Sequence, residues 1–135
     1  MTTASTAARN TAARNTYESN TVATASPAKL LVMLYDRLVR DLTNAEKAIG
    51  QRLLAQANSE LQHAQQIVLE LRSSLDVDAW SGGPGLDQLY TYLHGELVAA
   101  NVEKDALRVA TCREIVEPLR DAWRTAALQI LQQSP

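Results

Sequence analysis

Two histidines and one cysteine are the side chains of this sequence best suited to chemistry. His63 follows Glu60 by three positions, a spacing found in metal sites of helical bundles, but the Glu-x-x-His pair occurs only once. A helical wheel places His63 on the polar face of its helix. A phosphotransfer histidine needs a neighbouring lysine, and neither His63 nor His94 has one. We therefore interpret His63 as a solvated residue and predict no metal site.

Other signatures of catalysis are equally weak. Cys112 lies in the middle of an apolar stripe, which is typical of a buried and inert thiol. Gly82-Gly83-Pro84-Gly85 is not followed by the lysine of a phosphate-binding loop. We also find no Ser/His/Asp constellation. Nothing in the sequence argues for an enzyme, and we expect no cofactor.

Composition limits the class of protein further. The chain has 135 residues and a net charge of −2, so it lacks the basic field that nucleic-acid binding usually requires. One cysteine excludes internal disulfides. No apolar run is long enough for a membrane span, and the N-terminus lacks the apolar core of a signal peptide. We expect a soluble, cytoplasmic protein that does not insert into membranes.

The spacing of apolar residues predicts an all-α protein. Four amphipathic helices are expected over about 27–50, 52–75, 86–102 and 106–131, with a loop at Gly82 to Gly85. Ser26 and Pro27 are suited to the start of the first helix, and Asp105 to the cap of the last. Pro118 should kink the last helix or split it in two. Short connections imply an antiparallel up-down four-helix bundle over residues 26–135.

Residues 1–25 have a different composition. They are mostly Thr, Ala, Ser, Asn and Arg, and they include a tandem Thr-Ala-Ala-Arg-Asn repeat. Few large apolar side chains are present to offset the entropy of ordering. We predict a flexible polar arm or a short capping helix, in which only Tyr17 and Val22 are suited to docking on the bundle.

The first helix has more apolar surface than a single core requires. Its apolar arc spans roughly 200°, whereas about 100° is enough for a helix that faces one core. Either several neighbours surround this helix or part of the arc binds a partner. Tyr90 and Tyr92 point about 160° apart by the same wheel, so one is expected in the core and the other outside it. Asp36 is placed to pair with Arg40.

A longer pattern makes the sequence recognisable. The stretch from Tyr17 to Asp36 has a tyrosine, an asparagine three positions later, Thr-Ala-Ser-Pro and an apolar run that closes in Met-Leu-Tyr-Asp. It resembles the N-terminal signature of the flagellar secretion chaperone FliS family. Residues 64–75, Leu-Tyr-Thr-Tyr-Leu at 89–93 with Ala-Asn at 100–101, and Asp-Ala-Trp at 121–123 resemble later parts of that family in the same order.

The resemblance implies a cytosolic chaperone that binds the disordered C-terminal segment of flagellin in apolar grooves. Such a chaperone prevents premature polymerisation and delivers flagellin to the export gate protein FlhA of the type III export apparatus. In the family the N-terminal segment can fold over a groove and be displaced by flagellin. Binding of this kind couples folding to association, so ordering cost offsets much of a large contact area.

The resemblance also suggests which residues contact the partner. Tyr17 corresponds to the N-terminal tyrosine that the family links to the groove cover and to engagement of the export gate. The candidate partner-binding residues are Tyr17, Val22, Leu31, Leu34, Tyr35, Leu38, Leu89, Tyr92, Leu93 and Leu97. Each of the leucines and tyrosines in the bundle could instead belong to the ordinary core.

The sequence departs from the family pattern at three places. Arg37 follows Tyr-Asp where the family often has glycine, His94-Gly95-Glu96 replaces an arginine pair, and Lys104-Asp105 replaces Asn-Asp.

Two alternatives to the chaperone hypothesis remain open. One is a phosphotransfer bundle acting through a histidine. The other is a bundle whose apolar face serves only weak self-association into a homodimer.

Overall fold

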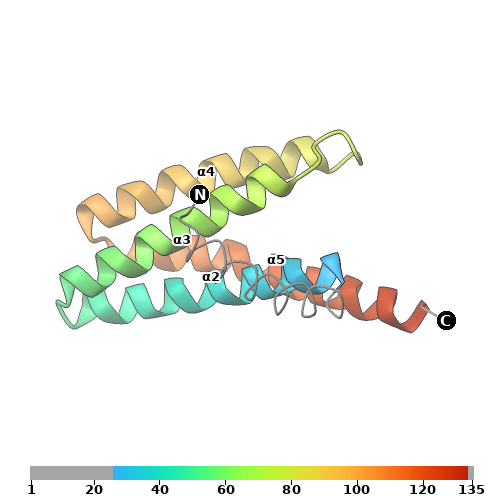
Figure 1. Cartoon of the computed structure of the whole chain (residues 1–135). Coiled ribbons are helices and arrows are strands. Elements are labelled where there is room, and N and C mark those ends of the chain that lie inside the picture. The colour runs from blue at the N-terminus through green and yellow to red at the C-terminus, as the bar shows by residue number, and fades with distance from the viewer. Residues whose placement is uncertain (1–25, 134–135) are drawn as a thin grey trace, which may run out of the picture.

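The computed structural model describes residues 26–133, and these form four helices and no strand. The helices are α2 (Pro27–Gly50), α3 (Leu54–Ser74), α4 (Gly83–Glu103) and α5 (Ala106–Gln133). They run alternately up and down, with α2 and α5 side by side and α3 and α4 forming the other pair (Figure 1). The all-α, antiparallel four-helix bundle is confirmed. The expectations for the arm at 1–25 lie outside the described residues.

Helix α2 is the most enclosed element of the bundle. It packs extensively on both α3 and α5, whereas α4 packs on α3 and, less extensively, on α5. Eight of its residues are buried, including Tyr35, Leu38 and Leu42. Two large packing partners therefore account for much of the broad apolar arc of this helix.

Within residues 26–133, no helix combines the length and the apolar character that a membrane span requires.

The predicted starts of α2 and α5 are confirmed by hydrogen bonds at their N-termini. The Ser26 hydroxyl accepts the Lys29 N–H at 3.1 Å, and Pro27 occupies the first turn. Asp105 Oδ1 accepts the N–H groups of Leu107 and Arg108 at 3.1 and 3.2 Å. These caps satisfy backbone donors that have no partner within the helix.

The predicted loop at Gly82 to Gly85 is wrong in part, because α4 begins at Gly83 rather than Leu86. Pro84 fits in the first turn, where no backbone N–H is required. Gly83 is buried, and a Cβ there would lie 2.1 Å from the Val77 carbonyl oxygen. The glycine therefore permits close packing of the α3–α4 connection instead of continuing the loop.

Helix α5 does not split at Pro118, so that alternative is also wrong. Proline removes one backbone hydrogen bond, at a cost of about 3 kcal/mol in a helix interior. Pro118 is exposed, and buried Val116 lies two residues before it. The extensive packing of α5 on α2 offsets the cost and keeps the helix continuous.

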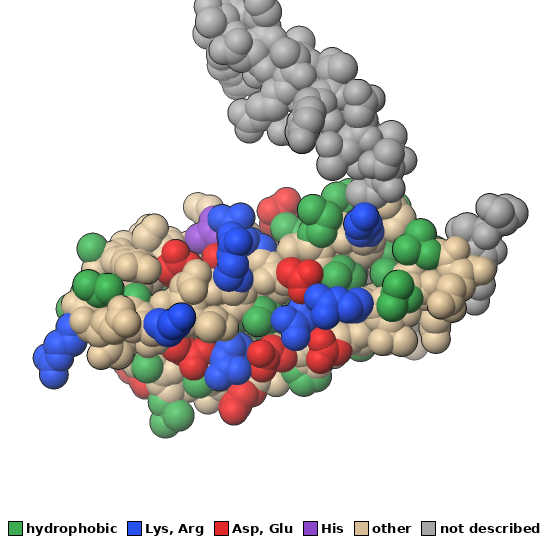
Figure 2. Space-filling model, turned by 90° about the horizontal axis from the view of Figure 1, so that it is seen from below, with side chains coloured by type: hydrophobic (Ala, Val, Ile, Leu, Met, Phe, Trp, Pro, Cys, Tyr) green, Lys and Arg blue, Asp and Glu red, His purple; other side chains and the backbone are tan. Residues whose placement is uncertain are grey.

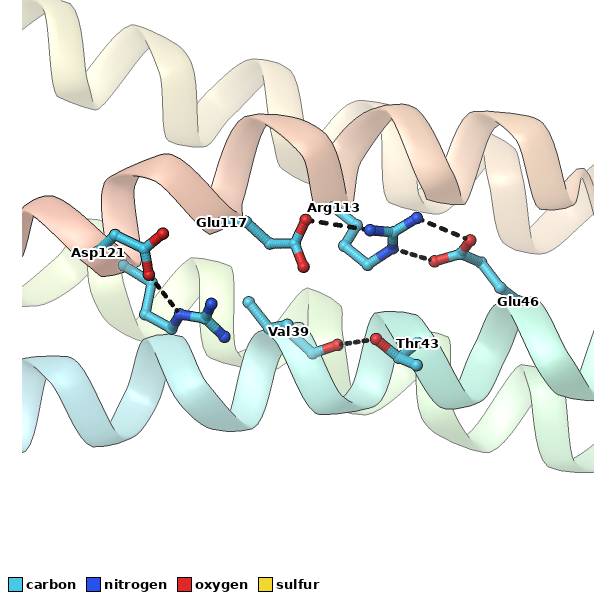
Figure 3. A network of polar contacts seen from close by, with 7 residues as sticks. Val39, Thr43, Glu46, Arg113, Glu117 and Asp121 are labelled. Atoms are coloured by element: carbon cyan, nitrogen blue, oxygen red, sulfur yellow. Dashed lines mark hydrogen bonds and ion pairs between the residues drawn. The ribbon is translucent and has the colours of Figure 1, made fainter.

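Ion pairs between carboxylates of α2 and arginines of α5 join the two helices. Arg113 binds Glu46 with two nitrogens, Nε at 2.5 Å and Nη2 at 3.3 Å, and binds Glu117 through Nη1 at 3.0 Å (Figure 3). The hydrogen bonds to Glu46 raise the pKa of the Arg113 guanidinium above its ordinary value. Figure 2 shows acidic and basic side chains next to one another on this side of the bundle.

Asp36 also lies at the contact between α2 and α5, and its observed partners differ from the one predicted. Its carboxylate lies 2.7 Å from Arg124 and 3.8 Å from Arg120 of α5, rather than pairing with Arg40 of its own helix. The i,i+4 spacing permits a pair along one helix. The neighbouring helix provides two cations that the spacing rule does not consider.

Arg113→Ala is expected to lower the free energy of unfolding by about 1 kcal/mol, because it removes a bidentate charge-assisted pair. Both partners are only about a quarter exposed, at 26% and 23%. Urea unfolding followed by circular dichroism measures the loss. Arg124→Ala is the matched control, since Arg124 is 48% exposed and should cost less than about 0.5 kcal/mol. Equal losses in the two variants would contradict the prediction.

Candidate protein-binding groove

A groove of about 730 Å³ lies between the first half of α2 and the second half of α3. Because the two helices are antiparallel, the start of α2 faces the end of α3. The walls are mainly apolar, with polar side chains from α2 and α3. The lining residues are Pro27, Leu30, Leu31, Met33, Leu34, Arg37, His63, Ile67, Glu70 and Ser74.

The groove contains two of the partner-binding residues proposed from the sequence. Leu31 and Leu34 are half-buried and line it, with their inner sides packed against the core. Met33 is 50% exposed in the same groove and was not among the candidates. Its place on the lining of the groove depends on the rotation of α2 against α3.

The other candidates lie elsewhere. The structure buries four of them in the bundle core, namely Tyr35, Leu38, Leu93 and Leu97. Leu89 is half-buried against the same core, and Tyr92 is 50% exposed on α4. The candidates of α4 are thus not brought together with Leu31 and Leu34 in one groove. Tyr17 and Val22 lie outside the described residues.

The polar end of the groove is a feature that sequence reasoning missed. Asp41 is 3% exposed, and its Oδ2 is hydrogen-bonded to Nδ1 of His63. Its Oδ1 lies 3.4 Å from Nε of Arg37. His63 is therefore half-buried and paired, and our interpretation of it as a solvated residue was wrong. The available signal was Asp41 itself, which follows Leu38 by three and precedes Ala45 by four on the buried stripe.

The pair also bears on the metal and phosphotransfer hypotheses. His63 is oriented by the Asp41 carboxylate across the α2–α3 contact. Within residues 26–133 there is no group of three or more His, Cys, Asp or Glu side chains that could hold a metal ion. The paired histidine lies on the wall of the apolar groove.

Tyr35 and Tyr90 form a second buried polar contact, across the middle of the bundle. Their hydroxyl oxygens are 2.6 Å apart, and the side chains are 0% and 2% exposed. Burial raises the pKa of both phenols above the ordinary value. As predicted, one of the pair Tyr90 and Tyr92 lies in the core and the other does not.

Trp123 packs against the core cluster that contains these tyrosines. Its Nε1 is buried without a hydrogen-bond partner in the described part of the chain. Trp80 of the α3–α4 connection meets Trp123 edge to face, with ring centroids 6.4 Å apart. This contact joins the α3–α4 connection to α5.

Cys112 is buried as predicted, and desolvation raises the pKa of its thiol to about 11.

Comparisons with known proteins agree with this architecture. The sequence model of "Flagellar protein FliS" matches residues 9–130. The flagellar secretion chaperone FliS of Bacillus subtilis (strain 168) is 32% identical over 105 residues, which is 78% of each chain. The protein of the same name from Vibrio cholerae serotype O1 (strain ATCC 39315 / El Tor Inaba N16961) is 28% identical over 103 residues, or 76% of each chain.

A solved structure supports the fold. The crystal structure of a bacterial flagellar chaperone superposes with a TM-score of 0.71 and 20% identity, covering 89% of this chain and 98% of that one. The match to the family model extends over most of the chain, from before the Tyr17 signature to the last turns of α5. The chain therefore belongs to the FliS family of flagellar secretion chaperones.

Proposed function

We propose that this chain is a cytoplasmic export chaperone that binds the C-terminal segment of flagellin. The observation that carries the proposal is the α2–α3 groove, whose apolar lining includes half-exposed Met33 and half-buried Leu31 and Leu34. An amphipathic helix laid in such a groove buries its apolar stripe. Binding in this way keeps the flagellin segment from polymerising until it is delivered to the export gate protein FlhA. The proposal assigns the chain no catalytic step.

The candidate residues have different roles in this proposal. Leu31 and Leu34 contact the flagellin segment directly, and Leu89 and Tyr92 contact it where it continues onto α4. Tyr35, Leu38, Leu93 and Leu97 support the grooves from the core, because their side chains are almost fully buried. Tyr17 and Val22 cover a groove until flagellin displaces them.

Calorimetric titration of the full chain with a flagellin C-terminal peptide tests the proposal. We expect a one-to-one complex, a negative heat capacity change from apolar burial and a gain of helix by circular dichroism. Deleting residues 1–25 or making Tyr17→Ala is expected to tighten peptide binding severalfold, because the groove no longer has to be vacated. Thr16→Ala is the control for Tyr17→Ala and should bind like the parent.

Two results would contradict this reading. A folded protein that does not bind the peptide lacks the proposed client. Light scattering that shows a dimer unaffected by the peptide would favour the self-association hypothesis instead.

A further inference from the structure

The two ends of the α2–α3 groove differ in charge. Arg37 and His63 lie at the inner end, near the middle of the bundle, whereas Glu70 lies toward the end where α2 begins. Between them the walls are apolar, from Leu30, Leu31, Leu34 and Ile67. A helix in this groove therefore meets hydrogen-bond donors at one end and a carboxylate toward the other.

Asp41 holds the inner end in place. Its buried carboxylate bonds to His63 Nδ1 and lies 3.4 Å from Arg37 Nε. The Arg37 side chain is 50% exposed and lines the groove, so a ligand in the groove can contact it. Because the guanidinium is already oriented, less side-chain entropy is lost when it binds an acceptor.

The length of the groove limits what fits. Ten residues separate Pro27 from Arg37 along α2, which corresponds to about 15 Å of helix rise or about three turns. On α3 the lining runs from His63 to Ser74, a similar distance. A helix of about three turns can therefore place its apolar stripe along the walls while one of its ends lies at Arg37.

We propose that the groove accepts a client helix in a single direction, with its C-terminal end at Arg37 and His63 and its axis parallel to α2. The last carbonyls of a helix have no partner within it and carry partial negative charge, so they are suited to the Arg37 guanidinium. The N-terminal end carries partial positive charge and lies toward Glu70. Arg37 determines the direction of the client helix, and Asp41 holds the Arg37 side chain in position. This inference rests on the proposed function, because the client is the flagellin C-terminal segment.

Paramagnetic broadening tests the direction. A nitroxide is attached to the full chain at Ser74→Cys, in a Cys112→Ala background, and resonances of an isotope-labelled flagellin C-terminal peptide are recorded. We expect the label to broaden the N-terminal residues of the bound helix. A label at Gln62→Cys, near the inner end, should broaden its C-terminal residues. The reverse pattern, or equal broadening of both ends by each label, would overturn the proposal.

Charge substitutions provide a second test on the same peptide. Arg37→Gln is expected to weaken binding about tenfold, because it removes a charge-assisted contact to the helix end. Arg40→Gln is the matched control, since Arg40 is exposed on the same helix and does not line the groove. Circular dichroism shows whether both variants fold. Unchanged binding in a folded Arg37→Gln protein would overturn the proposal.

These outcomes separate the direction from the function. Tight peptide binding in the reverse direction would overturn only the direction, whereas no binding by the parent chain would overturn both. The same spin labels are also recorded with the chain isotope-labelled instead of the peptide. If they broaden residues 1–25 of the chain and never the peptide, the groove belongs to the N-terminal segment, and the proposal is again wrong.

Discussion

Met33→Asp is expected to weaken binding of the flagellin C-terminal peptide about fiftyfold, because a carboxylate in an apolar groove must lose its water when the client helix covers it. Met33 is 50% exposed and lines the groove, so its replacement disturbs little of the core. We expect the free energy of unfolding to change by less than about 1 kcal/mol. Calorimetric titration measures the affinity, and urea unfolding measures the stability.

Leu107→Asp is the control for this prediction. Leu107 is also a large exposed apolar residue, 77% exposed, but it lies in the first turn of α5, at the opposite end of the bundle from the groove. Binding by this variant should equal that of the parent. If both variants lose affinity alike, the α2–α3 groove does not hold the client. Parent-like binding by Met33→Asp leads to the same conclusion.

Stability is expected to fall steeply above about pH 10 because of Tyr35 and Tyr90. Burial raises the pKa of both phenols in the folded chain, while in the unfolded chain they ionise near pH 10. The unfolded state therefore releases protons first as the pH rises. The tyrosine contribution is fully present below about pH 10, and each phenol removes about 1.4 kcal/mol per pH unit above it.

A double variant isolates this effect. Tyr35→Phe with Tyr90→Phe removes both hydroxyls at once, so neither is left buried without its partner. Cys112 contributes in the same sense between its ordinary pKa and about 11, so the comparison is made in a Cys112→Ala background. Urea unfolding at about pH 8 to 11 gives the slope, which should be markedly shallower in the variant. Equal slopes would exclude the tyrosines as the cause.

Local signals in the sequence predicted most of the helix boundaries. Ser26, Pro27 and Asp105 act on backbone groups within a few residues, so their roles follow from neighbouring positions alone. Apolar periodicity is equally local and identified all four helices. The start of α4 was missed because Gly83 and Pro84 read as a loop, whereas the close approach of Val77 makes the glycine a packing residue.

The predicted site depended on more than local signals. The resemblance to the FliS family pointed to apolar residues of α2 and α4, and the width of the α2 arc indicated surplus apolar surface. Periodicity alone does not separate Leu34, which lines the groove, from Leu38, which is buried one turn later. That distinction depends on how α2 is rotated between α3 and α5.

The sequence by itself determined the helices, their order, the bundle and the family. Each of these depends on patterns within short stretches of chain or on motifs in a fixed order. Only the tertiary structure decided the pairing of Asp41 with His63, of Tyr35 with Tyr90 and of Asp36 with Arg124, residues 22, 55 and 88 positions apart. Such pairs form because packing fixes the rotation and height of one helix against another, and no spacing rule along a single helix contains that information.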